Sequence, residues 1–202
     1  MLDRIQTAQQ LEKIIKNASE GKNTKFLNSA HSLWYRFKNY DKHPPFVLNV
    51  NNDPVAFVFA TYSKRSKYIN LYEIVTMQGQ EGNGYASKIW DLVMLDAYEN
   101  GKKLYFTKKG QLNFSCADCH VYQTGTKLRA DIPSPAIGHP THFPVYRSGM
   151  GRLVTLHERF AGCLNRIRAK SFKGGSEELN NLEFFTTFMS NGLEVNGPGS
   201  RK

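Results

Sequence analysis

Cys116, Cys119 and His120 stand in a C-x-x-C-H run, and the chain has only one further cysteine, Cys163. This spacing is typical of c-type haem attachment, in which both thiols form thioethers to the porphyrin and the histidine ligates the iron. A porphyrin held in this way supplies much of the core of a small domain. The sequence therefore predicts one covalent haem c and electron-transfer or haem-ligand chemistry.

Other interpretations of the cysteines remain open. Cys163 alone would be an inert buried thiol. Cys116, Cys119 and Cys163 with one histidine could form a Cys₃His zinc site, although Cys163 has no paired cysteine near it. A thioredoxin-like redox pair is disfavoured because no βαβ pattern surrounds the motif.

The length of 202 residues allows one large domain or two small ones. Hydrophobic residues make up 40% of the chain and charged residues 22%, as in an ordinary globular protein. No apolar run approaches the ~20 residues of a membrane span. The first ten residues lack the apolar core of a signal peptide, which is at odds with the export that normally precedes haem attachment.

Positive charge is concentrated in the second half of the chain. Residues 101–202 hold 15 Lys and Arg against 7 Asp and Glu, so they carry +8 of the total +10. Such a field favours anionic partners. Nucleic acid is disfavoured as a partner, because the basic residues are dispersed and no recognition motif accompanies them.

The first half alternates strand-like and helix-like patterns. An amphipathic helix is expected over residues 7–21, and a turn signal at 51–53 predicts a hairpin. A glycine-rich turn at 78–84 precedes a second expected helix, over about 85–100. The expected strands are residues 46–50, 55–61 and 68–76.

The second half is rich in proline and glycine, and its expected helices are short. Ser176 is positioned to cap a helix with acidic residues in its first turn. Apolar residues recur there at helical spacing, and Gly192 is expected to stop the helix. These apolar residues are Leu179, Leu182, Phe185 and Met189.

Several long stretches of the second half resemble one known family. In order along the chain they are residues 110–120, 125–131, 134–147, 155–163 and 189–199. They are similar to the SoxA family, the subunits of SoxAX cytochromes that begin periplasmic thiosulfate oxidation. The resemblance covers residues from about 98 to 202 and implies a mostly α-helical, loop-rich, class I cytochrome c-like domain.

This resemblance implies a role for each candidate site residue. Cys116 and Cys119 would form the thioethers, and His120 would be the proximal iron ligand. Cys163 would be the distal ligand, which in that family is modified to a persulfide and is the catalytic sulfur. Arg159, four residues before it, would bind the anionic substrate.

The same resemblance implies the reaction and the partners. Thiosulfate, or a similar sulfur anion, would be joined oxidatively to a carrier-protein cysteine, as by an L-cysteine S-thiosulfotransferase. A SoxX-type cytochrome subunit and a SoxYZ-type carrier protein would be the partners. The location would be periplasmic by the resemblance, or cytoplasmic if the first half of the chain determines where the protein is found.

Two residues also fit the first helix of small c-type cytochromes. In that helix a glycine, here Gly101, permits close approach of the C-terminal helix, and an aromatic residue one turn later, here Tyr105, packs on it. The expected partners are Leu182, Phe185 and Met189.

A different resemblance covers residues from about 46 to 100. Gly82, Gly84, Tyr85 and Ala86 follow the strands and open a helix, which resembles the acetyl-CoA loop of GNAT acetyltransferases, although Glu81 departs from that pattern. Backbone N–H groups at such a loop can approach a pyrophosphate. Glu73, on the preceding strand, would be the general base of an acetyl-CoA-dependent N-acetyltransferase.

Together the patterns predict an α+β chain that looks like a chimera. Residues 1–90 would form an N-terminal helix and an incomplete, GNAT-like antiparallel sheet, and residues 91–202 a SoxA-like cytochrome c domain. The segment 102–106 would be helical if it belongs to the cytochrome domain, and a strand if it belongs to the GNAT-like sheet. An inactive chimeric chain is the third interpretation.

Overall fold

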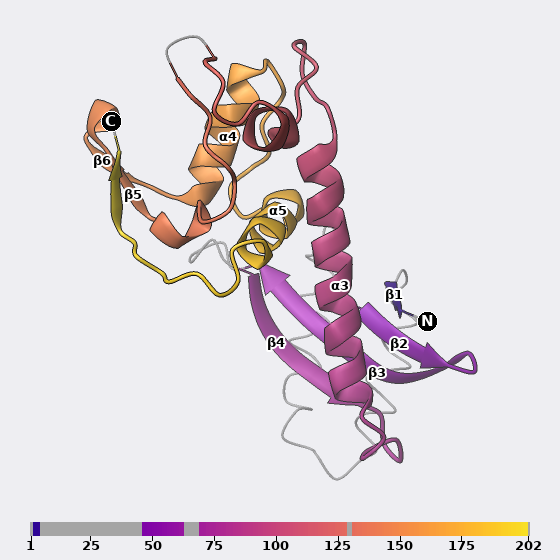
Figure 1. The fold of residues 1–202 in the computed structure, drawn as a ribbon. Coiled ribbons are helices and arrows are strands. Elements are labelled where there is room, and N and C mark those ends of the chain that lie inside the picture. Colours follow the sequence, from indigo (N-terminus) through magenta and orange to yellow (C-terminus); the bar gives the residue numbers. More distant parts are fainter. Residues whose placement is uncertain (1, 5–45, 63–68, 129–130, 202) are drawn as a thin grey trace. The chain divides into compact units, whose positions relative to one another are not determined.

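The computed structural model describes residues 2–4, 46–62, 69–128 and 131–201 (Figure 1). The chain divides into two compact units, Met1–Leu95 and Asp96–Lys202. The helix expected over residues 7–21 lies outside the described residues. No helix in the described part of the chain combines the length and the apolar character that crossing a membrane requires.

The first unit is built on a four-stranded sheet in the order β1-β2-β3-β4, antiparallel throughout (Figure 1). The expected strands are confirmed with small changes in their bounds, as β2 (Phe46–Val50), β3 (Asp53–Tyr62) and β4 (Ile69–Thr76). Strand β1 (Leu2–Arg4) was not predicted, because three residues are too few for an alternating pattern to be recognised.

The turn between β2 and β3 is a tight hairpin, as the sequence predicts. Asn51 and Asn52 both adopt positive φ, 51° and 69°. Two-residue hairpins with positive φ at both central positions match the right-handed twist of the strands, and asparagine tolerates this conformation better than most residues. The turn sets Val50 opposite Asp53 in the strand register.

The core of the first unit comes from apolar runs on two strands and from one helix. One cluster of its buried residues consists of Leu48 on β2, Val55, Ala56 and Val58 on β3, and Ile89 on helix α3 (Tyr85–Phe106). Tyr85, Leu92 and Val93 pack against this cluster from the same helix. The helix therefore covers the sheet with the apolar residues that its spacing aligns on one side.

Helix α3 continues beyond the expected end at residue 100, and its last residues belong to the second unit. The contested segment 102–106 is helical. A Cβ at Gly101 would overlap the backbone carbonyl of Asn181 and lie 2.8 Å from Cβ of Phe185. The close approach of two helices at this glycine, expected from small c-type cytochromes, is therefore confirmed.

The second unit also contains helices α4 (Leu156–Arg166) and α5 (Glu177–Phe188). Short helical turns interrupt the loops between them: η2 (Asp118–Tyr122), η3 (Pro140–His142) and η4 (Ser148–Met150). A small sheet in the order β6-β5-β7 was not predicted. Its strands are β5 (Val145–Arg147), β6 (Arg152–Val154) and β7 (Gly199–Arg201).

Helix α5 begins as expected, because the Ser176 hydroxyl accepts a hydrogen bond from the backbone N–H of Leu179. Leu179, Leu182 and Phe185 are buried, and Met189 packs against them. The expected stop at Gly192 is wrong. The helix ends at Phe188, and Gly192, with φ of 85°, instead belongs to the turns that follow.

Candidate haem-binding site

The C-x-x-C-H run forms a helical turn that is held at its first residues by a side-chain cap. The Asp118 carboxylate accepts hydrogen bonds from the backbone N–H and the hydroxyl of Ser115, at 2.7 and 2.8 Å. The Ser115 hydroxyl in turn accepts from the backbone N–H of Asp118 at 3.1 Å. These bonds, the one from the Ser115 backbone most of all, lower the pKa of Asp118. The cap fixes the path of the backbone that carries Cys116 and Cys119.

The His120 ring is oriented by a backbone carbonyl. Its Nδ1 lies 2.8 Å from the carbonyl oxygen of Ser134. Because a carbonyl can only accept, Nδ1 carries the proton and Nε2 is left with its lone pair. Iron-ligating histidines are commonly oriented by the same kind of bond. His120 is thus already in the tautomer that a metal ligand needs.

The three cysteines are free, half-buried thiols. Burial raises the pKa of Cys116 to about 12, and nearby Cys163 adds to that rise. The pKa of Cys119 is also raised, by burial and then by Cys163. Cys163 lies on helix α4, 44 residues after Cys119 in the sequence. It is therefore close enough to the other two thiols to interact with them electrostatically.

Helix α4 presents Cys163 from a well-capped helix. The Thr155 hydroxyl accepts from the backbone N–H of Glu158, and the Glu158 carboxylate accepts from the backbone N–H of Thr155 at 2.9 Å. Arg159 and Cys163 both lie within the helix at a spacing of four, so they share a face, as the sequence indicates.

Tyr105 brings a buried hydroxyl toward the cysteines. The residue is only 2% exposed, and its hydroxyl has no hydrogen-bond partner. Burial raises its pKa above the usual tyrosine range, and the nearby Cys116 and Cys119 add to the effect. A buried hydroxyl without a partner costs free energy, so this atom marks a place where an additional polar group would be accommodated.

Two residues near this region were not singled out by the sequence patterns. The His139 ring lies 4.9 Å from the His120 ring, edge-on, and its Nε2 lies 2.8 Å from the Ser134 hydroxyl. Burial lowers the pKa of His139 to about 4, and His120, Arg201 and Arg159 lower it further in that order. His139 and Arg201 therefore lie near the candidate anion-binding Arg159. In the sequence, only the family resemblance over residues 134–147 could have indicated that His139 lies near the site. No motif around Arg201 indicates that it does.

His157 has a structural role. Its Nδ1 accepts from the backbone N–H of Gly175 at 2.9 Å, and its Nε2 lies 2.7 Å from the carboxylate of Glu183. It thereby ties the start of helix α4 to helix α5, as expected for a histidine that is not a ligand.

The donor set fits a c-type haem better than the alternatives. The paired thiols lie on one capped turn, the adjacent imidazole has a free Nε2, and a third thiol lies nearby on another helix. Within the described residues, no three His, Cys, Asp or Glu side chains are gathered closely enough to hold a metal ion. The structure therefore offers no preformed Cys₃His zinc site.

The expected acetyl-CoA loop is a series of turns between β4 and α3. Gly82 and Gly84 adopt positive φ, 80° and 73°, so glycine is required there by the backbone conformation. Tyr85 and Ala86 begin helix α3, and Glu73 lies on β4 opposite Phe59. These positions agree with a strand–turn–helix arrangement, which many proteins share. The GNAT-like assignment and the acetyl-CoA alternative stay predictions.

The second unit is similar to a known class of domains. Residues 100–195 match the family model described as SoxA/TsdA, cytochrome c domain. This range contains both cysteines and the histidine of the C-x-x-C-H run, and Cys163. The segment is therefore similar to a class of cytochrome c domains, in agreement with the resemblance seen in the sequence.

Two individual proteins to which the chain is similar carry the name SoxA. The chain is 60% identical over 108 residues to the L-cysteine S-thiosulfotransferase subunit SoxA of Allochromatium vinosum, covering 54% of this chain and 38% of that protein. The protein of the same name from Chlorobaculum tepidum is 56% identical over 115 residues, covering 57% of this chain and 40% of the relative.

A solved structure supports the same conclusion. The crystal structure of SoxXA from P. pantotrophus aligns with a TM-score of 0.50 at 40% identity, over 53% of this chain and 40% of that one. The chain thus spans about two fifths of the length of the relatives it matches. The similarity supports a SoxA-like cytochrome c domain, and the GNAT-like part of the expected chimera is not shown.

Proposed function

We propose that the chain is a haem c-dependent sulfur transferase of the SoxA type, which joins thiosulfate to a cysteine of a carrier protein. The thiosulfate sulfane sulfur would form a disulfide bond with the carrier sulfur. The carrier thiol would lose its proton to solvent, and two electrons would leave to one-electron acceptors. Thiosulfate plus carrier thiol then gives carrier S-thiosulfonate, one proton and two electrons, so the reaction balances.

Each candidate site residue would have a separate role in this reaction. Cys116 and Cys119 would tether the haem, His120 would ligate its iron, and Cys163 would ligate from the other side. Bound haem would supply one-electron redox chemistry at this site. Arg159 would hold the sulfonate oxygens of thiosulfate, since a guanidinium offers a planar set of donors to an oxyanion.

The observation that carries this proposal is the tautomer of His120, which its hydrogen bond to a backbone carbonyl sets. The bond from its Nδ1 to the Ser134 carbonyl leaves Nε2 free at the residue that directly follows the paired thiols. His157, which has a structural role, differs: its Nδ1 accepts from Gly175 and its Nε2 lies 2.7 Å from the Glu183 carboxylate. The electrostatic interaction of Cys163 with Cys116 and Cys119 adds the third sulfur to the same region.

The partners and the location are part of the proposal. The net charge of +8 over residues 101–202 would attract a dianion such as thiosulfate. By the family resemblance, a SoxX-type subunit would bind beside the domain, a SoxYZ-type protein would carry the product, and the compartment would be the periplasm, where haem attachment takes place.

Expression with a cytochrome c maturation system tests the proposal. Intact mass should increase by one haem, and a further single-sulfur increase that Cys163→Ser removes would identify a persulfide. The Soret band should survive denaturation, since thioethers are covalent. A colourless protein of unmodified mass under these conditions would refute haem attachment.

Arg159→Ala tests the role assigned to the arginine. Losing a charge-assisted hydrogen bond of about 1.5–3 kcal/mol should lower kcat/KM for thiosulfate by about tenfold to a hundredfold. Arg166→Ala is the matched control, because Arg166 is an exposed cation in the last turn of the same helix. Equal losses in both variants would assign the effect to general charge and not to Arg159.

A further inference from the structure

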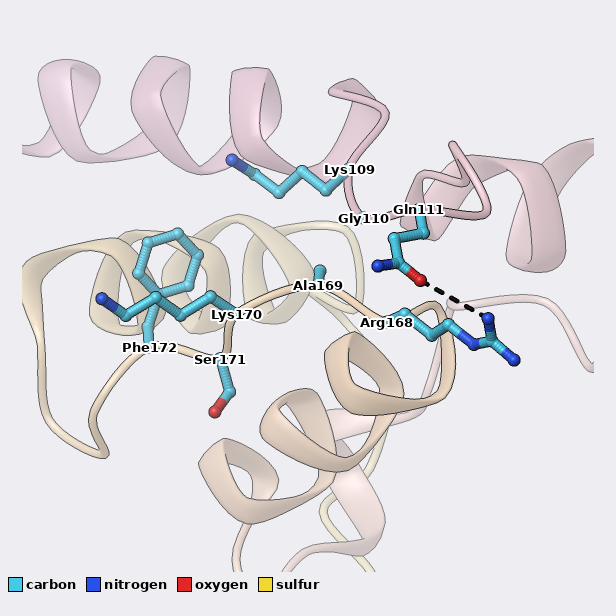
Figure 2. A pocket seen from close by; sticks show the side chains of 8 residues that line it. All are labelled: Lys109, Gly110, Gln111, Arg168, Ala169, Lys170, Ser171 and Phe172. Atoms are coloured by element: carbon cyan, nitrogen blue, oxygen red, sulfur yellow. Dashed lines mark hydrogen bonds between the residues drawn. The ribbon is translucent and has the colours of Figure 1, made fainter.

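A shallow, open pocket of about 720 Å³ lies in the second unit, formed by two separate segments (Figure 2). One segment is 109–111, which follows helix α3 and leads to the cysteine turn. The other is 168–172, which follows helix α4. We call it the basic pocket. Its lining residues are Lys109, Gly110, Gln111, Arg168, Ala169, Lys170, Ser171 and Phe172.

The two walls of the basic pocket are fastened together by the backbone. A Cβ at Gly110 would overlap the carbonyl oxygen of Ile167, so only glycine permits this approach. The same carbonyl accepts a hydrogen bond from the backbone N–H of Leu112 at 3.3 Å. Ala169 donates its N–H to the carbonyl of Leu164, the residue after Cys163, at 2.9 Å. The pocket is therefore connected directly to the last turn of helix α4.

The cations at the basic pocket are placed by specific features of each segment. The Lys109 ammonium lies 5.5 Å from the centre of the Phe172 ring, within the range of a cation–π contact. Phe172 itself packs against the core of the unit. Arg168 has φ of 57°, a left-handed conformation that is costly for a residue with a Cβ. Three of the eight lining residues are cationic, and none is acidic.

The directions of these side chains indicate what kind of anion the pocket suits. Figure 2 shows Lys109 and Lys170 on the side of Phe172, while Arg168 extends in the opposite direction beside Gln111. The Arg168 guanidinium donates to the Gln111 side-chain oxygen at 3.4 Å. A single small oxyanion needs donors that converge on one point, whereas these cations are spread along an open surface. Several carboxylates spaced along a peptide match them better.

We propose that the basic pocket is a docking site for an acidic segment of a partner protein, which places one carboxylate at Lys109 and Lys170 and another at Arg168. The aromatic ring of Phe172 would contact the aliphatic part of a Glu side chain in the same segment. A partner bound here would contact both the segment that enters the cysteine turn and the segment that leaves the Cys163 helix. This inference does not depend on the proposed reaction.

Helix stabilisation explains only part of the cluster. Cations near a helix C-terminus interact favourably with the helix dipole, and Arg166 and Arg168 fit that role for helix α4. Lys109 comes from a different segment, and Lys170 lies beyond the last turn. Neither lies in the last turn of a helix, where the dipole acts, so both ammonium groups remain available to an external anion.

The test measures binding of a fluorescein-labelled peptide of alternating Glu and Ala to the full haem-loaded chain. We expect weak, salt-sensitive binding. The variant Lys109→Glu with Lys170→Glu should weaken it by at least about tenfold. Lys103→Glu with Lys127→Glu changes the net charge equally at exposed lysines outside the pocket, and should weaken it by less than about twofold.

Carbodiimide cross-linking, which joins carboxylates to nearby lysines, locates the peptide. Cross-links should form at Lys109 and Lys170, and Lys109→Arg with Lys170→Arg should lose them while keeping the affinity. These arginine variants keep the test valid if the glutamate variant fails to fold. The proposal is overturned if the control pair weakens binding equally or if the cross-links fall elsewhere. It is also overturned if free thiosulfate or sulfate at low millimolar concentration displaces the peptide while the basic-pocket variants have no effect.

Discussion

The two units of the chain differ in how their cores are made. In the first, five buried side chains from two strands and a helix form one cluster. In the second, the buried cluster joins helices α3 and α5 to Ala117, inside the C-x-x-C-H run, with Cys116 packed beside it. The core of the second unit therefore extends into the very residues that would carry haem.

This difference shows in the exposed apolar residues. Between residues 107 and 140 the second unit has loops whose large apolar side chains are exposed. They are Leu112, Phe114, Val121, Tyr122, Leu128, Ile132 and Ile137. In the first unit strands and a helix supply the described cluster, whereas in the second unit the cluster includes a residue of the C-x-x-C-H run. Its stability should therefore respond to the chemistry of that motif.

The largest effect is expected for Cys116→Ser combined with Cys119→Ser. Without thioether attachment, the amides around residues 107–140 should exchange rapidly, while those of strands β2 and β3 should keep their protection. Hydrogen exchange of the haem-matured proteins, followed by mass spectrometry, measures both regions at once. Cys163→Ser is the control, since it leaves both tethering thiols in place. Equal protection of the second unit in all three proteins would show that its fold does not need the motif.

A smaller effect is expected for Gly101→Ala, which tests the helix packing of the second unit. The added methyl group would overlap the Asn181 carbonyl, so the free energy of unfolding should fall by about 1–3 kcal/mol. Gly162→Ala is the matched control. It lies inside helix α4 with open space around its Cβ and should gain about 0.5–1 kcal/mol. Urea denaturation measures both, and a neutral Gly101→Ala would contradict the close approach.

The cap of helix α4 should contribute about 1 kcal/mol, in a pH-dependent way. Thr155→Ala removes the hydroxyl that accepts from Glu158. The backbone N–H of Thr155, more than any other group, lowers the pKa of Glu158 in the folded chain. A lowered folded-state pKa means that the carboxylate stabilises the fold above its ordinary pKa, and that this contribution is lost as pH falls through the lowered value.

Urea midpoints of the wild type and Thr155→Ala, compared at neutral pH and at about pH 3, measure this effect. The difference between the two proteins should shrink slightly at the acidic pH, because protonation of Glu158 weakens the bond that the Thr155 hydroxyl donates to its carboxylate. The larger backbone contribution is kept in both proteins. Thr124→Ala provides a control, because its hydroxyl donates to the backbone carbonyl of Val121 and not to a carboxylate. A stability difference that stays constant with pH would show that the contribution of the Thr155 hydroxyl does not depend on the Glu158 carboxylate.

The smallest effect is expected for Tyr105→Phe. In protein produced without haem, removing a buried hydroxyl that lacks a partner should leave the free energy of unfolding unchanged or raise it by less than about 1 kcal/mol. Tyr98→Phe is a matched control in the same helix, where the hydroxyl is not among the buried unpaired atoms. A loss of more than about 1 kcal/mol for Tyr105→Phe would mean that its hydroxyl already has a partner.

The sequence predicts the parts of this molecule that depend on local rules. The strand-like runs in 46–76, the turn at Asn51 and Asn52, and the Ser176 cap each act within a few residues, and the structure confirms them. The contact of Gly101 with Asn181 was predictable only through the resemblance to small cytochromes, because it joins two distant helices.

Other features depend on contacts that no local pattern records. Strands β5 and β7 are three residues each, and they pair in parallel although Val145 and Gly199 are far apart in sequence. The placement of His139 against His120, and of Arg201 near both, likewise follows from how the loops return to the same region. The C-x-x-C-H chemistry could be predicted, but not the side chains that surround it.

The carbonyl that orients His120 has a consequence for how this domain can evolve or be engineered. Ser134 precedes Pro135, and a residue before proline is restricted to extended conformations, which limits where its carbonyl can point. The acceptor belongs to the main chain, so exchanging the serine side chain leaves it in place. The orientation of the imidazole should therefore tolerate replacement of the Ser134 side chain, whereas replacing Pro135 would remove the restriction on the carbonyl that accepts from Nδ1.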